Sequence, residues 1–88
     1  MNEGKNMDKK KIPTYHTKSL YLSAFLLYRN IPLLHVKRDA SRKVEFIFED
    51  CSPEREQLVQ SFFNNSAEVK VQGFCNALRN IKTIIYEG

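Results

Sequence analysis

Basic side chains are the residues of this chain whose number and spacing could do chemistry. Lysine and arginine number 14 against 10 aspartate and glutamate residues, a net charge of +4. They gather in an N-terminal arm, in a polar stretch at residues 38–43 and near the C-terminus. The candidate set is Lys9, Lys10, Lys11, Arg38, Arg42, Lys43, Arg79 and Lys82. Such side chains neutralise backbone phosphates, so the set predicts contact with single-stranded or double-stranded nucleic acid.

Most of this positive charge belongs to the N-terminus. Residues 1–18 carry a net charge of +3, whereas residues 19–88 carry nine basic and eight acidic side chains, a net charge of +1. An ordinary solvated surface therefore explains the charges of residues 19–88 as well as a phosphate site does. Tyr15 and Tyr86 would add base stacking if they are exposed.

Residues that catalyse reactions or bind metals are few and dispersed. The two histidines and two cysteines have no common motif, and His35 is expected to form only a surface pair with Glu45 or Glu49. Cys51 and Cys75 lack a C-x-x-C spacing, which predicts free thiols, with Cys75 a small core residue. The three glycines are too far apart for a phosphate-binding loop. We therefore expect no enzyme, no metal site and no cofactor.

The element that must position these residues is the apolar run at 20–28, LYLSAFLLY. It predicts a helix with no polar face, covered by protein because nine residues span only ~14 Å and a bilayer needs ~20 residues. Thr17 is the preferred N-cap, with Ser19 as the alternative. Asn30 and Pro32 end the helix.

A β-hairpin follows, because residues 33–37 and 44–49 alternate with a period of two. Pairing Val36 with Phe46 is favoured, since the alternative register places Lys37 opposite Lys43. The expected core face is Leu34, Val36, Phe46 and Phe48. The outer face then shows an apolar patch of Leu33, His35 and Ile47, a second candidate site for a protein partner or a second copy.

Two more helices complete the expected fold. One begins with Ser52 as N-cap and Pro53 at its first position and runs to about Asn64. The other spans residues 71–86, where apolar residues recur at helical spacing; they are Phe74, Ala77, Leu78, Ile81 and Ile85. Ile12–His16 or Val69–Val71 is expected to add a third, edge strand.

These elements predict an α+β fold in the order helix, β-hairpin, helix, helix, with the hairpin packed on three helices. Residues 1–11 are expected to form a flexible basic arm, and residues 12–88 a single compact domain. No apolar stretch is typical of a signal peptide or a membrane span, which favours the cytoplasm.

Several short motifs follow one another along the chain, most of them core and turn residues. They are Thr17-x-x-Leu20-Tyr21-Leu22, Val36-x-Arg38-Asp39, Phe46-x-Phe48-Glu49-Asp50, Ser52-Pro53 and Phe74-x-x-Ala77-Leu78-x-x-Ile81-Lys82. Over about residues 14–86 this order resembles a family of small uncharacterised bacterial and phage proteins, a domain of unknown function found largely in mobile elements. The resemblance implies a prokaryotic or phage setting and no reaction. We therefore expect a small non-enzymatic binding protein, with nucleic acid as the first partner and a protein-interaction module or homodimer as the alternative.

Overall fold

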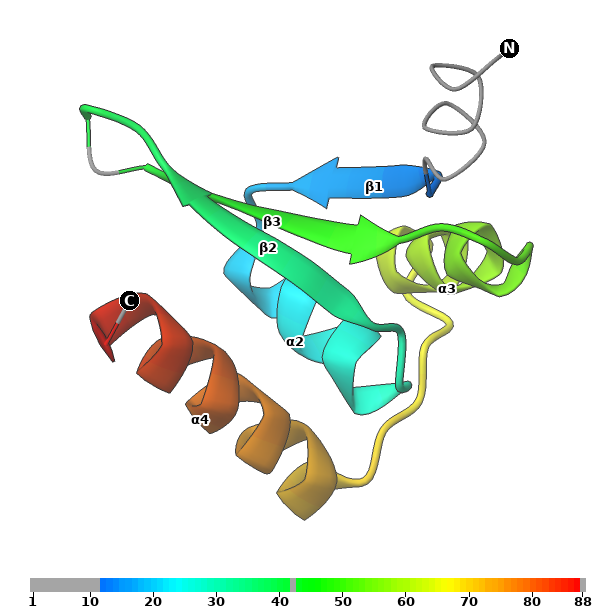
Figure 1. Ribbon diagram of the computed structural model, residues 1–88. Helices are drawn as coiled ribbons and strands as arrows, with labels where there is room; N and C mark the ends of the chain where they lie inside the picture. The colour runs from blue at the N-terminus through cyan, green and yellow to red at the C-terminus, as the bar shows by residue number, and fades with distance from the viewer. Residues whose placement is uncertain (1–11, 42, 88) are drawn as a thin grey trace, which may run out of the picture.

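Helix α2 (Leu20–Tyr28) lies at the centre of an α+β fold in the computed structural model, which describes residues 12–41 and 43–87. It contacts both α3 (Glu54–Phe63) and α4 (Val71–Glu87), and the helices lie on one side of the sheet (Figure 1). Strands β1 (Thr14–Thr17), β2 (Leu33–Arg38) and β3 (Val44–Glu49) form an antiparallel sheet with the order β1-β3-β2. The predicted fold class and element order are confirmed.

The middle of α2 is the core of the molecule. Leu22, Ala24, Phe25 and Leu26 are at most 1% exposed, and they pack with Phe46 and Phe48 of β3 and with residues of α3 and α4. The buried hydroxyl of Ser23 donates to the carbonyl oxygen of Ser19 at 2.8 Å, so this polar group keeps a partner inside the core. The expectation that protein covers this helix is confirmed for residues 22–26, whereas Tyr21 is 56% exposed.

The N-cap of α2 is Ser19, and the preference for Thr17 was wrong. The Ser19 hydroxyl accepts the backbone N–H of Leu22 at 3.1 Å. Thr17 is the last residue of β1, where its hydroxyl accepts the backbone N–H of Ser19 at 3.1 Å. Pairing with β3 holds Thr17 in the strand, so the helix can begin only after the next turn of the chain.

The C-terminus of α2 follows the predicted chemistry, and α3 ends in the same way. Asn30 and Asn65 both have φ of 68°, the left-handed conformation that ends a helix. After α2, the N–H of Ile31 reaches back to the carbonyl oxygen of Leu26 at 3.0 Å, which is the long bond of a Schellman motif. The start of α3 differs from the prediction: the helix begins at Glu54 after Pro53, and no side-chain cap bond is formed there among the described residues.

The third strand comes from the N-terminal candidate. β1 pairs with β3, with Tyr15 opposite Phe48 and His16 opposite Ile47. The alternative strand at Val69–Val71 is wrong, because Val71 is already the first residue of α4 and the Phe74 N–H bonds to the Lys70 carbonyl oxygen at 2.9 Å.

The hairpin has the predicted register but not the predicted face at its start. Val36 lies opposite Phe46 and Lys37 opposite Glu45. The register shifts between Leu33 and His35, which places Leu33 opposite Phe48 and packs Leu33 against the core. A bulge changes which side a residue faces. Leu33 therefore replaces Leu34 on the core face, and the expected position of Leu33 on the outer face was wrong.

Helix α4 presents the predicted apolar face. Ile81 is fully buried and Ala77 is 6% exposed, while Phe74, Leu78 and Ile85 pack around the core. Cys75 is exposed, so its predicted core position was wrong: it lies about 100° round the helix from Phe74. Cys75 and the exposed Cys51 are free thiols, as predicted. Over residues 12–41 and 43–87, no helix combines the length and the apolar character needed to cross a membrane.

Candidate functional site

A hollow of about 260 Å³ lies at the turn end of the hairpin, and basic side chains dominate its lining. The lining residues are Lys18, Lys37, Arg38, Asp39, Lys43 and Glu45. We call this site the basic hollow. Its walls come from the β1–α2 connection, the end of β2, the hairpin loop and the start of β3.

The sheet brings these separate segments together. β1 runs antiparallel to β3 and ends with Thr17 opposite Phe46, so the next residue, Lys18, reaches the start of β3. Lys37 lies opposite Glu45 and Arg38 opposite Val44, which places both at the same end. Lys18 and Lys37 were not among the predicted phosphate contacts. A prediction that β1 pairs with β3 would have placed Lys18 beside the start of β3.

Asp39 serves the hairpin loop. Its carboxylate oxygen accepts the Ser41 hydroxyl at 2.7 Å, the Ser41 N–H at 2.9 Å and the Lys43 N–H at 3.0 Å. The Ser41 hydroxyl, followed by the Lys43 N–H, lowers the pKa of Asp39 below its ordinary value. This acid is therefore ionised at neutral pH, and its bonds are made within the loop.

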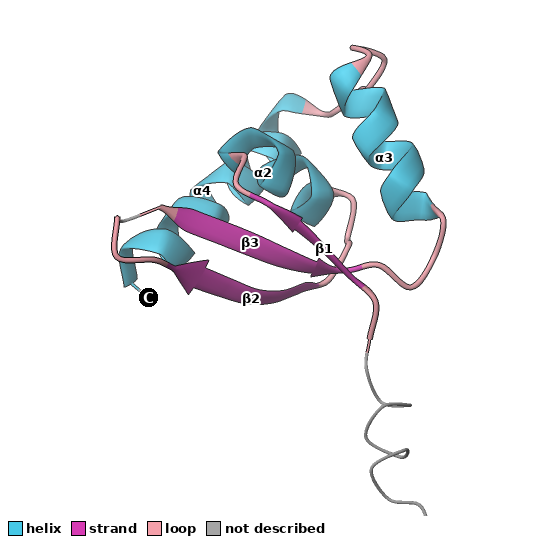
Figure 2. Cartoon of the chain, turned by 90° about the horizontal axis from the view of Figure 1, so that it is seen from above, coloured by secondary structure: helices cyan, strands magenta, loops and turns pink. Residues whose placement is uncertain are grey.

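Arg38 connects the hairpin to the last turn of α4. Its guanidinium donates to the carbonyl oxygens of Ile84, at 3.4 Å, and Ile85. Figures 1 and 2 both show the C-terminal end of α4 beside the hairpin. A cation at this place satisfies helix-end carbonyls and complements the helix dipole. Arg38 therefore has a structural role besides lining the hollow.

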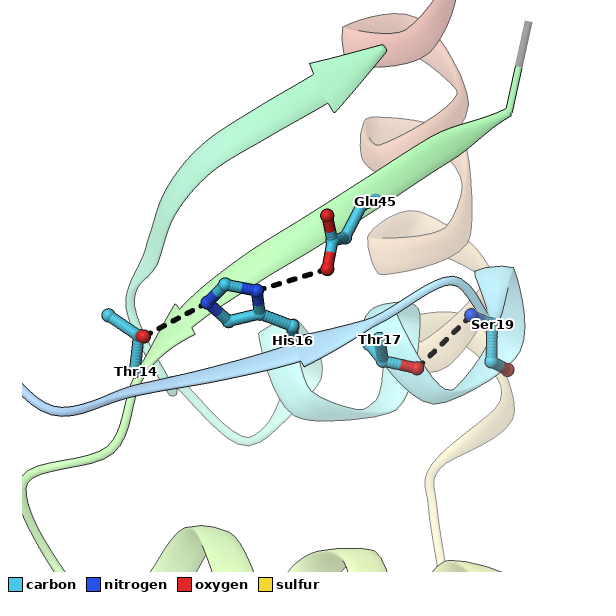
Figure 3. A network of polar contacts seen from close by, with 5 residues as sticks. All are labelled: Thr14, His16, Thr17, Ser19 and Glu45. Atoms are coloured by element: carbon cyan, nitrogen blue, oxygen red, sulfur yellow. Dashed lines mark hydrogen bonds and ion pairs between the residues drawn. The ribbon is translucent and has the colours of Figure 1, made fainter. Parts of the chain in front are cut away.

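Glu45 is held by a histidine of the neighbouring strand. His16 Nδ1 lies 3.0 Å from Glu45 Oε2, and His16 Nε2 lies 3.0 Å from Thr14 Oγ1, in a row across β1 and β3 (Figure 3). The Thr14 hydroxyl, the His16 imidazole and the Glu45 carboxylate follow one another in the same order as the three groups of a hydrolase catalytic triad. The side chains of His16 and Glu45 are 44% and 30% exposed, whereas triad chemistry depends on an enclosed site that orders its substrate. We interpret the row as a surface link between strands, made by His16 and not by His35.

Three lysines of the basic hollow form no ion pair with any acid in the described part of the chain. Among the described residues, Arg55 forms an ion pair with Asp50, and the other close contact of an acid with a basic group is that of Glu45 with the His16 ring. Lys18, Lys37 and Lys43 are exposed and belong to neither of them. The hollow thus concentrates unpaired positive charge from three segments, which is an arrangement that can bind an anionic group.

Comparison with protein families assigns the chain to a family. The model of a domain of unknown function, DUF5659, matches residues 13–87. The chain belongs to this family. Comparison with curated proteins and with solved structures found no match. The predicted resemblance to a domain of unknown function is thus confirmed, and the DUF5659 match spans every lining residue of the basic hollow.

Two other predicted phosphate contacts of this DUF5659 domain, Arg79 and Lys82, are not among the described residues that line the basic hollow. Arg79 and Lys82 are exposed on α4, and Arg79 donates to the Asn76 side-chain oxygen at 3.0 Å. Arg42 and Lys9–Lys11 lie outside the described residues. The described chain starts at the other end of the sheet from the hairpin turn, because Thr14 pairs with Glu49.

The two tyrosines proposed for base stacking have different surroundings. Tyr15 is half-buried, and the Arg55 guanidinium lies over its ring at 4.3 Å from the centroid. Arg55 also forms an ion pair with Asp50, which fixes it over the ring. Tyr86 is 82% exposed near the C-terminal end of α4. Only Tyr86 meets the condition of exposure.

The predicted apolar patch on the outer face of the hairpin is absent from the described part of the domain. Leu33 packs against the core through the bulge, and Ile47 is only 5% exposed. His35 is exposed and lies opposite Ile47, with His16 opposite it on the other side. The added strand β1 makes β3 the central strand, which explains why Ile47 is covered.

Proposed function

We propose that this DUF5659 domain is a non-enzymatic protein that binds nucleic acid through backbone phosphates at the basic hollow. The observation that supports this proposal is the convergence of Lys18, Lys37 and Lys43 without an acidic partner among the described residues. A lysine ammonium is a point charge that suits phosphate oxygens. The described lining has four basic and two acidic side chains, so positive charge is in excess even though Asp39 and Glu45 keep their negative charges.

The proposed binding is mainly electrostatic. Every described residue that lines the hollow has a charged side chain, and none of these lining residues is aromatic. Contacts to phosphates set affinity and position, whereas base contacts set sequence preference. We therefore expect a strong dependence on salt and little discrimination between sequences.

The N-terminal lysines enter this proposal as a separate contribution. Lys9, Lys10 and Lys11 join the described chain at Ile12, at the end of the sheet away from the hairpin turn. Their contribution is measured by comparing the full chain with a chain that lacks residues 1–11.

The biological setting of the proposal is a bacterial or phage mobile element and the cytoplasm. The resemblance of the core and turn motifs supports the setting. A cytoplasmic protein of this kind would meet nucleic acid directly, which agrees with the proposed partner.

The experiment is a titration of fluorescent single-stranded DNA, RNA and duplex DNA with the full chain at low and moderate salt. Three lysine contacts predict a slope of about −2.7 for the logarithm of the duplex binding constant against the logarithm of salt concentration. Substituting Lys18, Lys37 and Lys43 together by alanine should remove most of that slope. Arg29→Ala is the matched control, because Arg29 is exposed at the opposite end of α2.

The same titration can refute the proposal. If the triple variant binds as tightly as the unaltered chain, the basic hollow is not the site. A chain without residues 1–11 measures the arm by itself. If only the arm contributes, the folded domain has another role, and the protein-interaction alternative gains support.

A further inference from the structure

A second hollow, of about 280 Å³, lies between α2, α3 and the start of α4, and its lining is mostly apolar. The lining residues are Phe25, Phe62, Asn65, Ala67, Val69 and Phe74. We call it the apolar hollow. A smaller hollow of about 250 Å³ shares Val69 with it and is otherwise lined by Tyr28, Glu68 and Lys70.

A row of phenylalanines leads from the core through the apolar hollow to the surface. The ring centroids of Phe25 and Phe62 are 5.8 Å apart, and those of Phe62 and Phe63 are 5.3 Å apart. Phe25 is 1% exposed, whereas Phe63 is 68% exposed. Val69, which lines the apolar hollow, is 39% exposed, and Val71 at the start of α4 is 74% exposed. Large apolar side chains gathered at the surface mark an interaction site.

The chain around the apolar hollow is unusually poor in charge. Residues 57–78 include the end of α3, the connecting loop and the first half of α4, and Glu68 and Lys70 are their only charged residues. Charged residues make up 27% of the whole chain, which would give about six in a stretch of this length. Depletion of charge around exposed aromatic side chains is typical of the centre of a protein interface.

We propose that a second copy of this chain covers the apolar hollow and forms a symmetric dimer. The whole chain has a net charge of +4, so two copies repel each other except where their surfaces are neutral. Glu68 and Lys70 flank Val69 with opposite charges. A twofold axis places the same surface on both sides, so Glu68 can pair with the partner's Lys70 and Lys70 with the partner's Glu68. Phe63 is the aromatic anchor that would fill the partner's apolar hollow.

The dimer surface is at the other end of α2 from the basic hollow. Lys18 precedes the N-terminus of α2, whereas the Tyr28 hydroxyl at its C-terminus accepts the backbone N–H of Lys70 at 2.9 Å. These ends are ~14 Å apart along the helix. The dimer would leave both basic hollows free. This inference does not rest on the proposed function, although two hollows per particle would strengthen binding to a long polyanion.

The test is sedimentation equilibrium of the full chain over a range of concentrations. The unaltered chain is expected to form a dimer, and Phe63→Ser should raise the dimer dissociation constant at least tenfold. Tyr86→Ser is the matched control, because Tyr86 is more exposed and lies at the other end of α4. It should leave the dissociation constant unchanged.

Charge variants test the paired arrangement independently. Glu68→Lys should weaken the dimer, because it places positive charge opposite the partner's Lys70, and adding Lys70→Glu should restore it. Circular dichroism confirms that each variant folds, and the charge variants decide the matter if Phe63→Ser unfolds. A chain that stays monomeric at every concentration, or a double charge variant that fails to recover, would overturn the proposal.

Discussion

Gly73 has a steric role in the first turn of α4, and Gly73→Ala tests it. A Cβ atom at this position would lie 2.7 Å from Cε1 of Tyr28 and 3.3 Å from Cδ1. The ring cannot move freely, because its hydroxyl accepts the backbone N–H of Lys70 at 2.9 Å. The absence of a side chain at residue 73 thus allows α2 and α4 to approach closely.

The change in the free energy of unfolding depends on one stabilising contribution and two destabilising ones. Alanine gains about 1 kcal/mol over glycine in a helix interior. Overpacking against the ring costs roughly 1–3 kcal/mol. If the ring turns away, the hydrogen bond to Lys70 is lost, which costs about 0.5–1.5 kcal/mol. Subtracting the helix gain from the overpacking cost, we expect Gly73→Ala to destabilise the domain by about 0–2 kcal/mol while the ring keeps its bond to Lys70, a fall in Tm of up to roughly 15 °C.

Urea unfolding followed by far-ultraviolet circular dichroism measures this change. The control is the same substitution in a Tyr28→Ala background, where the ring is absent. There Gly73→Ala should stabilise the protein by about 1 kcal/mol, since only helix propensity remains. If Gly73→Ala stabilises the unaltered chain as well, the close approach of Tyr28 does not constrain residue 73.

Three further predictions concern caps, an ion pair and a titrating loop. Ser19→Ala should cost about 1 kcal/mol in urea unfolding because it removes the N-cap of α2, whereas Ser52→Ala should change stability by less than about 0.5 kcal/mol. Arg55→Ala should cost about 1–2 kcal/mol, since two 3.0 Å bonds to Asp50 are lost at a site where the arginine is 17% exposed; an unchanged midpoint would contradict this. The Asp39 carboxyl should show a pKa below 3.8 in an NMR titration. Because folding lowers this pKa, its stabilising contribution is complete above pH 3.8 and is lost as pH falls through the lower, folded value, and Asp39→Asn should remove that part of the acid dependence.

The candidate sites show the limits of local sequence patterns. Arg38 and Lys43 could be identified as neighbours because a hairpin register depends on residues close in the chain. Lys18 joins them only because β1 pairs with β3, a contact across about thirty residues that no local period encodes. The apolar hollow also depends on packing, since Phe25, Phe62 and Phe74 come from three helices. The scarcity of charge at residues 57–78 was visible in the sequence, but only the exposure of Phe63 gives it meaning.

The sequence by itself determined the elements and their order. The apolar run at 20–28 must be buried, and Asn30 and Asn65 permit the left-handed turns that end helices. The alternation of the two hairpin strands limits the possible registers, and opposite charges favour the register that pairs Lys37 with Glu45. Tertiary structure decided which of two nearby residues caps a helix and which residue of a strand faces the core. Ser19 caps α2 because Thr17 is held in β1, and Leu33 faces the core because a bulge shifts the strand. These choices turn on long-range pairing and close packing, which involve partners far away in the chain.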